Sequence, residues 1–167
     1  MGANGLAAAA WNGYRVEMTT REAEKALQAF FRSYPTLKRW MRKHADDCQT
    51  RRRITIGAGR TLENAWEPKG IRYTQCCNLP IQGICADVMM RAVSGVYQRL
   101  RTEEIDAVMV AQIHDELILE AAIQDVDTVS TILNEEMTKA FCTTFPDAPF
   151  SDLVDVKSGR SWADLKD

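Results

Sequence analysis

The chain has 167 residues, 46% of them hydrophobic, which is enough apolar material for the core of one domain or of a large piece of one. It contains no apolar run long enough to span a membrane and no apolar segment of the signal-peptide type. Its five cysteines show no Cys-x-x-Cys spacing and it has only two histidines, so a zinc site is disfavoured, and the odd number of cysteines disfavours a disulfide scaffold. Reduced thiols in a cytoplasmic protein are the simplest interpretation.

The net charge of −2 conceals opposite balances in the two halves of the chain. Residues 1–75 hold 14 Lys and Arg against 7 Asp and Glu, whereas residues 76–167 hold 7 against 16. A basic half suits contacts with phosphates, and an acidic half suits the binding of a divalent cation. A solvated charge imbalance with no ligand would give the same numbers.

The first third of the chain predicts helices. Residues 1–18 indicate a short helix followed by a loop at Asn12-Gly13, and Thr19-Thr20-Arg21-Glu22 has the pattern of a capping box. Apolar residues at helical spacing continue until Pro35 ends or restarts the helix. We interpret the aromatic residues of this region as core, and the basic face of the second helix as solvated. The aromatic residues are Phe30, Phe31, Tyr34 and Trp40, and the basic residues are Lys38, Arg39, Arg42 and Lys43.

A basic hairpin is expected at residues 51–62. The stretch at residues 51–56 alternates and is β-branched, Gly57-Ala58-Gly59 supplies a turn, and residues 60–62 can return as a short strand. The arginines beside this turn suit phosphate contacts, and an exposed basic hairpin without a ligand is the alternative. They are Arg51, Arg52, Arg53 and Arg60.

The second half predicts a long helix, a hairpin and a further helix. Residues 81–100 hold the helical apolar pattern throughout, with Pro80 near the first turn, where proline is tolerated. A hairpin is expected at about residues 106–122, and a helix then runs from Gln124 to the next prolines. Residues 153–156 suggest a last strand. The predicted fold class is α+β, helix-rich, with a small antiparallel sheet.

A polar triplet, His114-Asp115-Glu116, interrupts the apolar residues of the predicted hairpin. Residues 108–113 before it and 117–119 after it have the pattern of two paired, half-buried strands, which places the triplet at the tip. Two adjacent carboxylates held there, Asp115 and Glu116, form a hard-oxygen site for Mg²⁺ or Mn²⁺. A polar turn without a ligand is the alternative, because aspartate is common in turns.

Two motifs resemble those of a known family. QIHDELILE, at residues 112–120, resembles the palm-hairpin motif of family A DNA polymerases, the group of bacterial polymerase I and its phage relatives. NLPIQGICAD, at residues 78–87, resembles the N-x-P-x-Q-G-x-x-A-D helix of that family. Weaker likenesses at residues 1–7 and 156–162 extend the resemblance, in the family's order and spacing, over nearly the whole chain.

The resemblance implies a role for each candidate residue. Asp115 would be one of two aspartates that bind the catalytic metal ions, Glu116 a secondary ligand, and His114 a neighbour of the primer terminus. Asn78 and Gln82 lie four residues apart on one helical face and would contact the minor groove of the duplex. Capping of the helix by Asn78 and a solvated Gln82 is the alternative.

The resemblance also divides the chain at residue 75. Residues 1–75 would be the end of the fingers and a basic segment, whose residues Arg51, Arg52, Arg53 and Arg60 contact the template–primer duplex. Residues 76–167 would be a palm segment that carries the metal-binding hairpin. The family often has an arginine four residues before the motif asparagine, where this chain has Thr74, and Arg72 would replace that contact.

The resemblance further implies an incomplete fold. The family needs a second metal-binding aspartate, in a D-Y-S-x-I-E-like strand, and a fingers helix whose lysine and tyrosine hold the nucleotide; neither pattern occurs here. We therefore expect the C-terminal part of a DNA-directed DNA polymerase of replication or repair. Its partners would be primer–template DNA, a dNTP and the polymerase segment with the second aspartate, and the isolated chain would not extend a primer appreciably.

Two other classes of protein remain open. An HD-type metal phosphohydrolase would combine His44 with His114-Asp115 and later aspartates, although such sites sit on helices rather than on paired strands. A non-catalytic DNA-binding remnant would use the basic half alone. It predicts salt-dependent duplex binding that is indifferent to Asp115 and to Mg²⁺.

Overall fold

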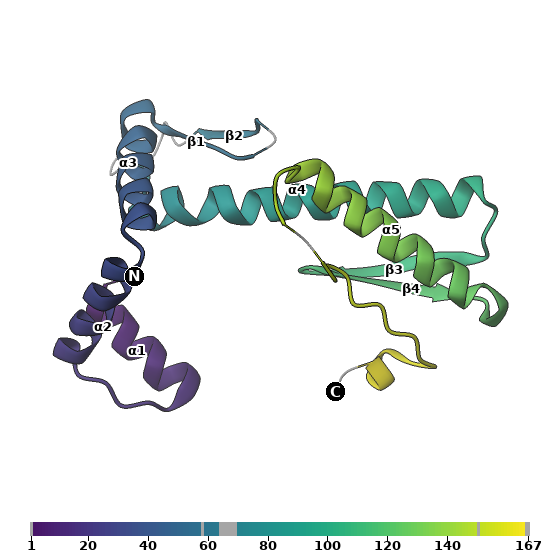
Figure 1. The fold of residues 1–167 in the computed structure, drawn as a ribbon, viewed down its shortest axis with the longest axis horizontal. Coiled ribbons are helices and arrows are strands. Elements are labelled where there is room, and N and C mark those ends of the chain that lie inside the picture. The colour runs from purple at the N-terminus through teal and green to yellow at the C-terminus, as the bar shows by residue number, and fades with distance from the viewer. Residues whose placement is uncertain (1, 58, 64–69, 150, 166–167) are drawn as a thin grey trace. The chain divides into compact units, whose positions relative to one another are not determined.

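The computed structural model describes residues 2–57, 59–63, 70–149 and 151–165, which belong to two compact units, Met1–Ile81 and Gln82–Asp167 (Figure 1). Helices dominate both units, and the described strands pair into two two-stranded antiparallel sheets. The α+β, helix-rich fold class is therefore confirmed. Within the described residues, no helix has the length and apolarity that crossing a bilayer would require.

Three helices open the first unit. Asn12-Gly13 was expected in a loop but lies inside the first helix, so that prediction is wrong. The helix ends at Arg15, which has a left-handed φ of 56° and whose N–H donates to the Trp11 carbonyl at 3.0 Å. This dipeptide by itself favours a turn, but contacts between the first two helices stabilise its helical conformation. The helices are α1 (Ala3–Tyr14), α2 (Thr20–Ser33) and α3 (Pro35–Arg51).

The capping box at the start of α2 is confirmed. The Glu22 N–H donates to Thr19 Oγ1 at 3.2 Å, while the Thr19 hydroxyl and N–H donate to Glu22 Oε2 at 2.7 and 2.8 Å. These bonds, the hydroxyl first, hold the pKa of Glu22 below its usual value because they favour the carboxylate. Pro35 restarts the helix as the first residue of α3, where its missing N–H has no partner to lose.

The basic hairpin is also present, but it is shorter than expected. Strand β1 (Arg53–Thr55) pairs with β2 (Thr61–Glu63), and Gly59 has a φ of 86° in the turn; Ala58 lies outside the described residues. Arg51 is the last residue of α3 and Arg52 caps it with a φ of 51°, so neither residue belongs to the strand. Ile54 points into the core of this unit. That core consists of Ala45, Cys48, Ile54, Ile71 and Cys76, with Leu79 packed against it.

The long helix α4 (Tyr73–Thr102) begins earlier than the sequence predicted. Pro80 therefore lies inside the helix rather than in its first turn, and the first-turn prediction is wrong. Proline has no N–H to donate to the carbonyl of Cys76, so one bond of the helical ladder is missing. Burial of Cys76 and Cys77, both less than 10% exposed, stabilises the turn before the proline and offsets that loss.

The second unit packs helices against the predicted hairpin. Strands β3 (Ala107–Ile113) and β4 (Glu116–Ala121) are antiparallel, and the short helix η1 (Ile123–Asp125) leads into α5 (Val126–Thr144). The expected last strand at residues 153–156 is absent; the part of the C-terminal segment that the structure describes contains only the short helix η2 (Trp162–Leu165). Asn134 Nδ2 donates to the Val154 carbonyl at 3.5 Å, which holds this segment to α5 without a ladder.

The core of the second unit lies between the hairpin and the two helices. Val108 and Val110 were expected to be half-buried, but they are 57% and 48% exposed, and the opposite face of the sheet contacts the core. The register steps from Met109–Leu119 to Ala111–Ile118, so Val110 is the extra residue of a β-bulge, while exposed and partly buried residues still alternate along β3. The buried core residues are Val96, Leu100, Val129 and Ile132, covered by Ile105, Ala107, Met109, Leu117, Leu119, Ala121 and Leu133.

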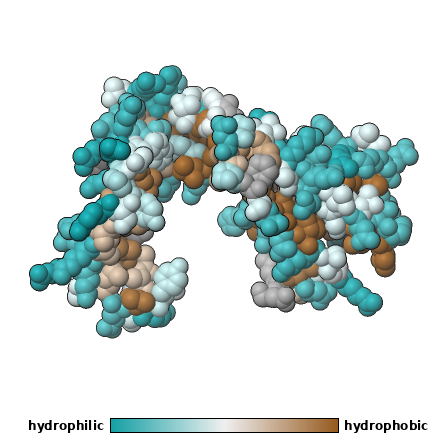
Figure 2. All heavy atoms as spheres, viewed as in Figure 1, coloured by the Kyte–Doolittle hydropathy of each residue, from teal (hydrophilic) through white to brown (hydrophobic). Residues whose placement is uncertain are grey.

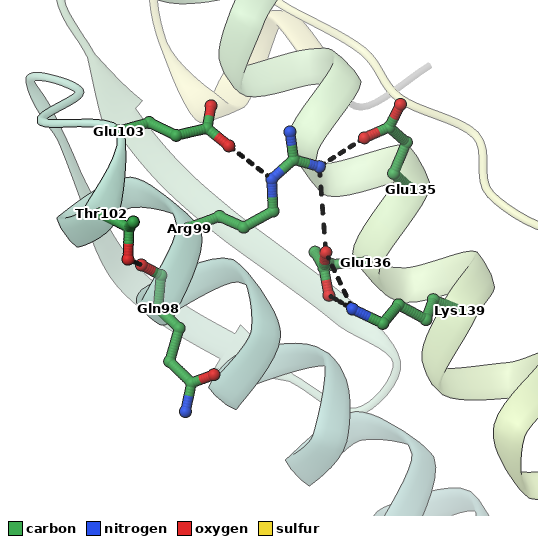
Figure 3. A network of polar contacts seen from close by, with 7 residues as sticks. All are labelled: Gln98, Arg99, Thr102, Glu103, Glu135, Glu136 and Lys139. Atoms are coloured by element: carbon green, nitrogen blue, oxygen red, sulfur yellow. Dashed lines mark hydrogen bonds and ion pairs between the residues drawn. The ribbon is translucent and has the colours of Figure 1, made fainter.

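A charged network joins α4 to α5 beside this core (Figure 3). Glu136 is only 8% exposed; its Oε2 lies 3.3 Å from Lys139 Nζ and its Oε1 lies 3.8 Å from Arg99 Nη1. Arg99 also pairs with Glu103 at 2.8 Å and with Glu135, which raises the pKa of its guanidinium. The buried carboxylate of Glu136 therefore has two cationic partners, which offset the cost of removing it from water.

Candidate active-site hairpin

The β3–β4 hairpin has a tip of only two residues. Ile113 pairs with Glu116, so His114 and Asp115 alone form the turn. His114 has a φ of 53°, in the left-handed region, whereas the φ of Asp115 is not positive. Two-residue loops are the commonest connections of antiparallel hairpins.

The tip presents three polar side chains to solvent. His114, Asp115 and Glu116 are all exposed, and Glu116 is already the first residue of β4. The inner face of the hairpin contacts the buried core through Met109, Leu117 and other apolar residues, which fixes the strands behind the tip. The expected hairpin and the position of its polar triplet are therefore confirmed.

The donor set of the tip fits a hard divalent cation. Carboxylate oxygens are the ligands that Mg²⁺ and Mn²⁺ prefer, and exposure spares Asp115 and Glu116 the desolvation cost of a deep site. In the described part of the chain, no group of three or more His, Cys, Asp or Glu side chains is arranged to hold a metal ion. Ligands beyond these two carboxylates would therefore come from bound substrate or from water.

The polar residues of the N-x-P-x-Q-G motif lie in α4. Asn78 and Gln82 are exposed and four residues apart, so they project from the same side of the helix. Capping by Asn78 is excluded, because α4 begins five residues before it at Tyr73. Arg72 lies just ahead of the helix, is exposed, and donates its N–H to Gln75 Oε1 at 3.1 Å.

The structure also gathers the predicted phosphate-binding arginines in one stretch of the first unit. Arg51 and Arg52 end α3, Arg53 opens β1, and Arg60 lies directly before β2. All four are exposed, and the Arg60 carbonyl accepts from the Ile56 N–H at 2.7 Å, which closes the turn. They belong to the Met1–Ile81 unit, and the hairpin tip belongs to Gln82–Asp167.

The second histidine has a structural environment. The His44 ring stacks on Trp40 with centroids 5.2 Å apart, and its Nε2 lies 3.5 Å from Cys48 Sγ. His114-Asp115 lies in a hairpin turn instead of the helix that an HD-type site needs. This geometry is contrary to the HD-type phosphohydrolase alternative.

Sequence reasoning missed two features near the tip. Residue 114 has a positive φ although it is neither glycine nor asparagine, and the β-bulge at Val110 lies within an apolar run that does not mark it. Histidine is enriched among non-glycine residues with positive φ, which is the only signal that the sequence offered.

Comparison with known proteins identifies the family. The sequence model of DNA polymerase family A matches residues 1–164. The chain belongs to this family. DNA polymerase I of Caldicellulosiruptor bescii is 29% identical over 160 residues, which are 90% of this chain and 18% of that protein. Thermostable DNA polymerase I of Thermus caldophilus is 31% identical over 152 residues, 87% of this chain and 17% of the relative.

A solved structure supports the fold. The POL domain of Pol1 from M. smegmatis, in complex with DNA primer-template and dNTP, superimposes with a TM-score of 0.70 and 22% identity. The similarity covers 83% of this chain and 24% of that one. The family A chain thus spans less than a fifth of the curated relatives above and a quarter of the solved domain.

Proposed function

We propose that this chain is the palm and end-of-fingers part of a DNA-directed DNA polymerase that acts in replication or repair. The observation that carries the proposal is the exposed Asp115 carboxylate on a two-residue turn, inside a motif of the polymerase family. In the complete enzyme, the primer 3′-hydroxyl attacks the α-phosphate of a dNTP and pyrophosphate leaves.

The hairpin tip would contribute to this reaction by holding carboxylates at a fixed point. Asp115 would present its oxygens as a metal ligand, and Glu116, held by its pairing with Ile113, would add a secondary one. Bound Mg²⁺ or Mn²⁺ would neutralise phosphate charge and lower the pKa of the attacking hydroxyl. His114 would lie beside the primer terminus.

The remaining polar residues would position the DNA. The amides of Asn78 and Gln82 carry donors and acceptors that suit base edges in the minor groove, and Arg72 would support them. The arginines of the α3 end and the β1–β2 hairpin would contact phosphates of the template–primer duplex. They are Arg51, Arg52, Arg53 and Arg60. On this proposal residues 1–75 serve the fingers and duplex, and residues 76–167 serve the palm.

Metal binding at Asp115 can be tested directly. Mn²⁺ binding to the 167-residue chain, with primer–template and dNTP present, is followed by electron paramagnetic resonance. We expect Asp115→Asn to weaken it roughly 10-fold or more, since even indirect supports of a metal site have effects of that size. Asp106→Asn is the matched control, because this exposed residue precedes the other end of the same hairpin. Equal effects of both variants would contradict a role for the tip.

The DNA-binding remnant makes the opposite prediction. It expects duplex binding that falls with salt and is the same with or without Mg²⁺ and Asp115. Primer extension tests a further expectation, which is that the chain alone does not extend a primer. Extension in Mg²⁺ that Asp115→Asn abolishes would show that the chain needs no additional polymerase segment.

A further inference from the structure

The exposed face of α3 carries four cations along its first three turns. Together with two acidic residues nearer the helix end, they line one shallow hollow, and hydrophilic residues dominate the surface over α3 in Figure 2. All six side chains are exposed. They are Lys38, Arg39, Arg42, Lys43, Asp46 and Asp47.

Two of these cations, Lys38 and Arg39, make local contacts with uncharged groups. The Lys38 ammonium lies 5.7 Å from the centroid of the Phe31 ring, and Arg39 Nη2 donates to Thr36 Oγ1 at 3.3 Å. A ring face and a hydroxyl carry no net negative charge. Residues 35–60 as a whole hold eight Lys and Arg against two Asp, so this part of the surface attracts polyanions.

A flat aromatic pair borders the same face. Trp40 stacks on His44 with an interplanar angle of 9°, and Trp40 is 38% exposed, so its interpretation as core is wrong. On a helix, residues three apart are neighbours, which places Trp40 beside Lys43. An exposed ring beside a row of cations is the combination that binds single-stranded nucleic acid, through base stacking and phosphate contacts.

We propose that the exposed face of α3 binds a single strand of DNA, with Arg39, Arg42 and Lys43 on its phosphates and Trp40 stacked on a base. This inference rests on the proposed function. It assigns the single strand to α3 and leaves the duplex to the arginines near β1. A single strand is the better ligand for this face, because the bases of a duplex are already stacked on one another. Asp46 and Asp47 would repel phosphates and so end the binding track.

The phosphate contacts are tested by charge. The exposed triple variant Arg39→Gln, Arg42→Gln, Lys43→Gln is compared with Arg21→Gln, Lys25→Gln, Arg32→Gln on α2, which removes the same charge from exposed sites of the same unit. Binding of a fluorescein-labelled oligothymidine is measured by anisotropy over a salt series. Loss of three contacts predicts roughly 100-fold weaker binding at about 0.1 M salt and a salt slope reduced by about 2, whereas the α2 triple keeps the slope.

The stacking contact and the acidic end are tested separately. Trp40→Ala should weaken oligothymidine binding about 10-fold but leave heparin binding unchanged, because heparin has no bases. Trp40→Phe should restore most of the affinity. Asp46→Asn with Asp47→Asn should tighten oligothymidine binding, and circular dichroism of each variant confirms that the helices remain folded.

The outcomes distinguish this inference from the proposed function. An α3 triple that binds oligothymidine like the wild type, or no worse than the α2 triple, would overturn the inference. Binding of a blunt duplex without any binding of oligothymidine would also overturn it and leave the proposed polymerase function standing. Failure to bind either DNA would contradict both. Selective loss of oligothymidine binding in the α3 triple, with duplex binding kept, supports it.

Discussion

Replacement of Gly95 by alanine gives a sharp test of the charged network between α4 and α5. A Cβ at this position would lie 2.4 Å from Glu136 Oε2 and 3.2 Å from its Cδ, so the carboxylate must move. Alanine by itself stabilises the interior of a helix by about 1 kcal/mol relative to glycine. The sign of the net effect therefore depends on how firmly Glu136 is held.

The structure indicates that Glu136 is held firmly. It is 8% exposed, and leaving Lys139 and Arg99 while still buried would leave an unpaired charge, which costs about 3–5 kcal/mol in a fully buried pair. Because Lys139 is 72% exposed, we take a reduced cost of about 2 kcal/mol. Gly95→Ala should then lower the free energy of unfolding of this unit by about 1 kcal/mol.

The sign should invert when the carboxylate is removed. In a Glu136→Ala background, Gly95→Ala should raise the free energy of unfolding by about 1 kcal/mol, so the two sites couple by about 2 kcal/mol. Amide hydrogen exchange in α5 measures this unit without interference from the first. Glu136→Gln is the control for size, since it keeps the clash and removes the charge. Equal stabilisation by Gly95→Ala in both backgrounds would refute the reasoning.

Three further predictions concern the turn, the capping box and the cysteines. His114→Gly should keep or slightly raise hairpin stability, and His114→Val should lower it by about 2 kcal/mol, since a β-branched residue tolerates a φ of 53° poorly; exchange in β3 reports both, and equal effects would contradict the strain. The pKa of Glu22 is lower in the folded chain than its unfolded value of 4.5, so this carboxylate stabilises α2 above pH 4.5. That stability is lost as the pH falls through the pKa of the folded state. Far-ultraviolet circular dichroism should therefore show an acid transition, which Thr19→Ala should reduce. Burial raises the pKa of Cys76 to about 11, so iodoacetamide should modify exposed Cys85 first and Cys76 last, and stability should fall as pH rises from 9 through 11; early labelling of Cys76 would contradict its burial.

The sequence predicted the features that depend on local pattern. The capping box at Thr19, the restart at Pro35 and the β3–β4 hairpin each need only a few neighbouring residues, and all three are confirmed. The position of Asp115 at the tip of paired strands followed from the same local signal. The metal-binding role of Asp115 is still a proposal, because it depends on further ligands and contacts that this local pattern does not include.

The features that the sequence could not predict depend on distant contacts. Pro80 inside α4 is tolerated because Cys76 and Cys77 pack against other elements of their unit, and no local pattern shows that packing. Glu136 interrupts the apolar face of α5, and only its neighbours Arg99 and Lys139 explain its burial. Trp40 was interpreted as core from its residue type alone. Its exposure depends on which other helices cover it, and the local sequence does not show that.

The β-bulge at Val110 determines the length of the turn that carries Asp115. With regular pairing continued from Met109–Leu119, Gln112 would face Glu116 and the loop would contain three residues; the extra residue in β3 makes Ile113 face Glu116 instead. A single-residue insertion or deletion in the middle of β3 would therefore change the length of the loop at the tip. For descendants of this gene, length changes in β3 should be rarer than substitutions at the exposed Val108 and Val110, because only the former displace the acidic turn.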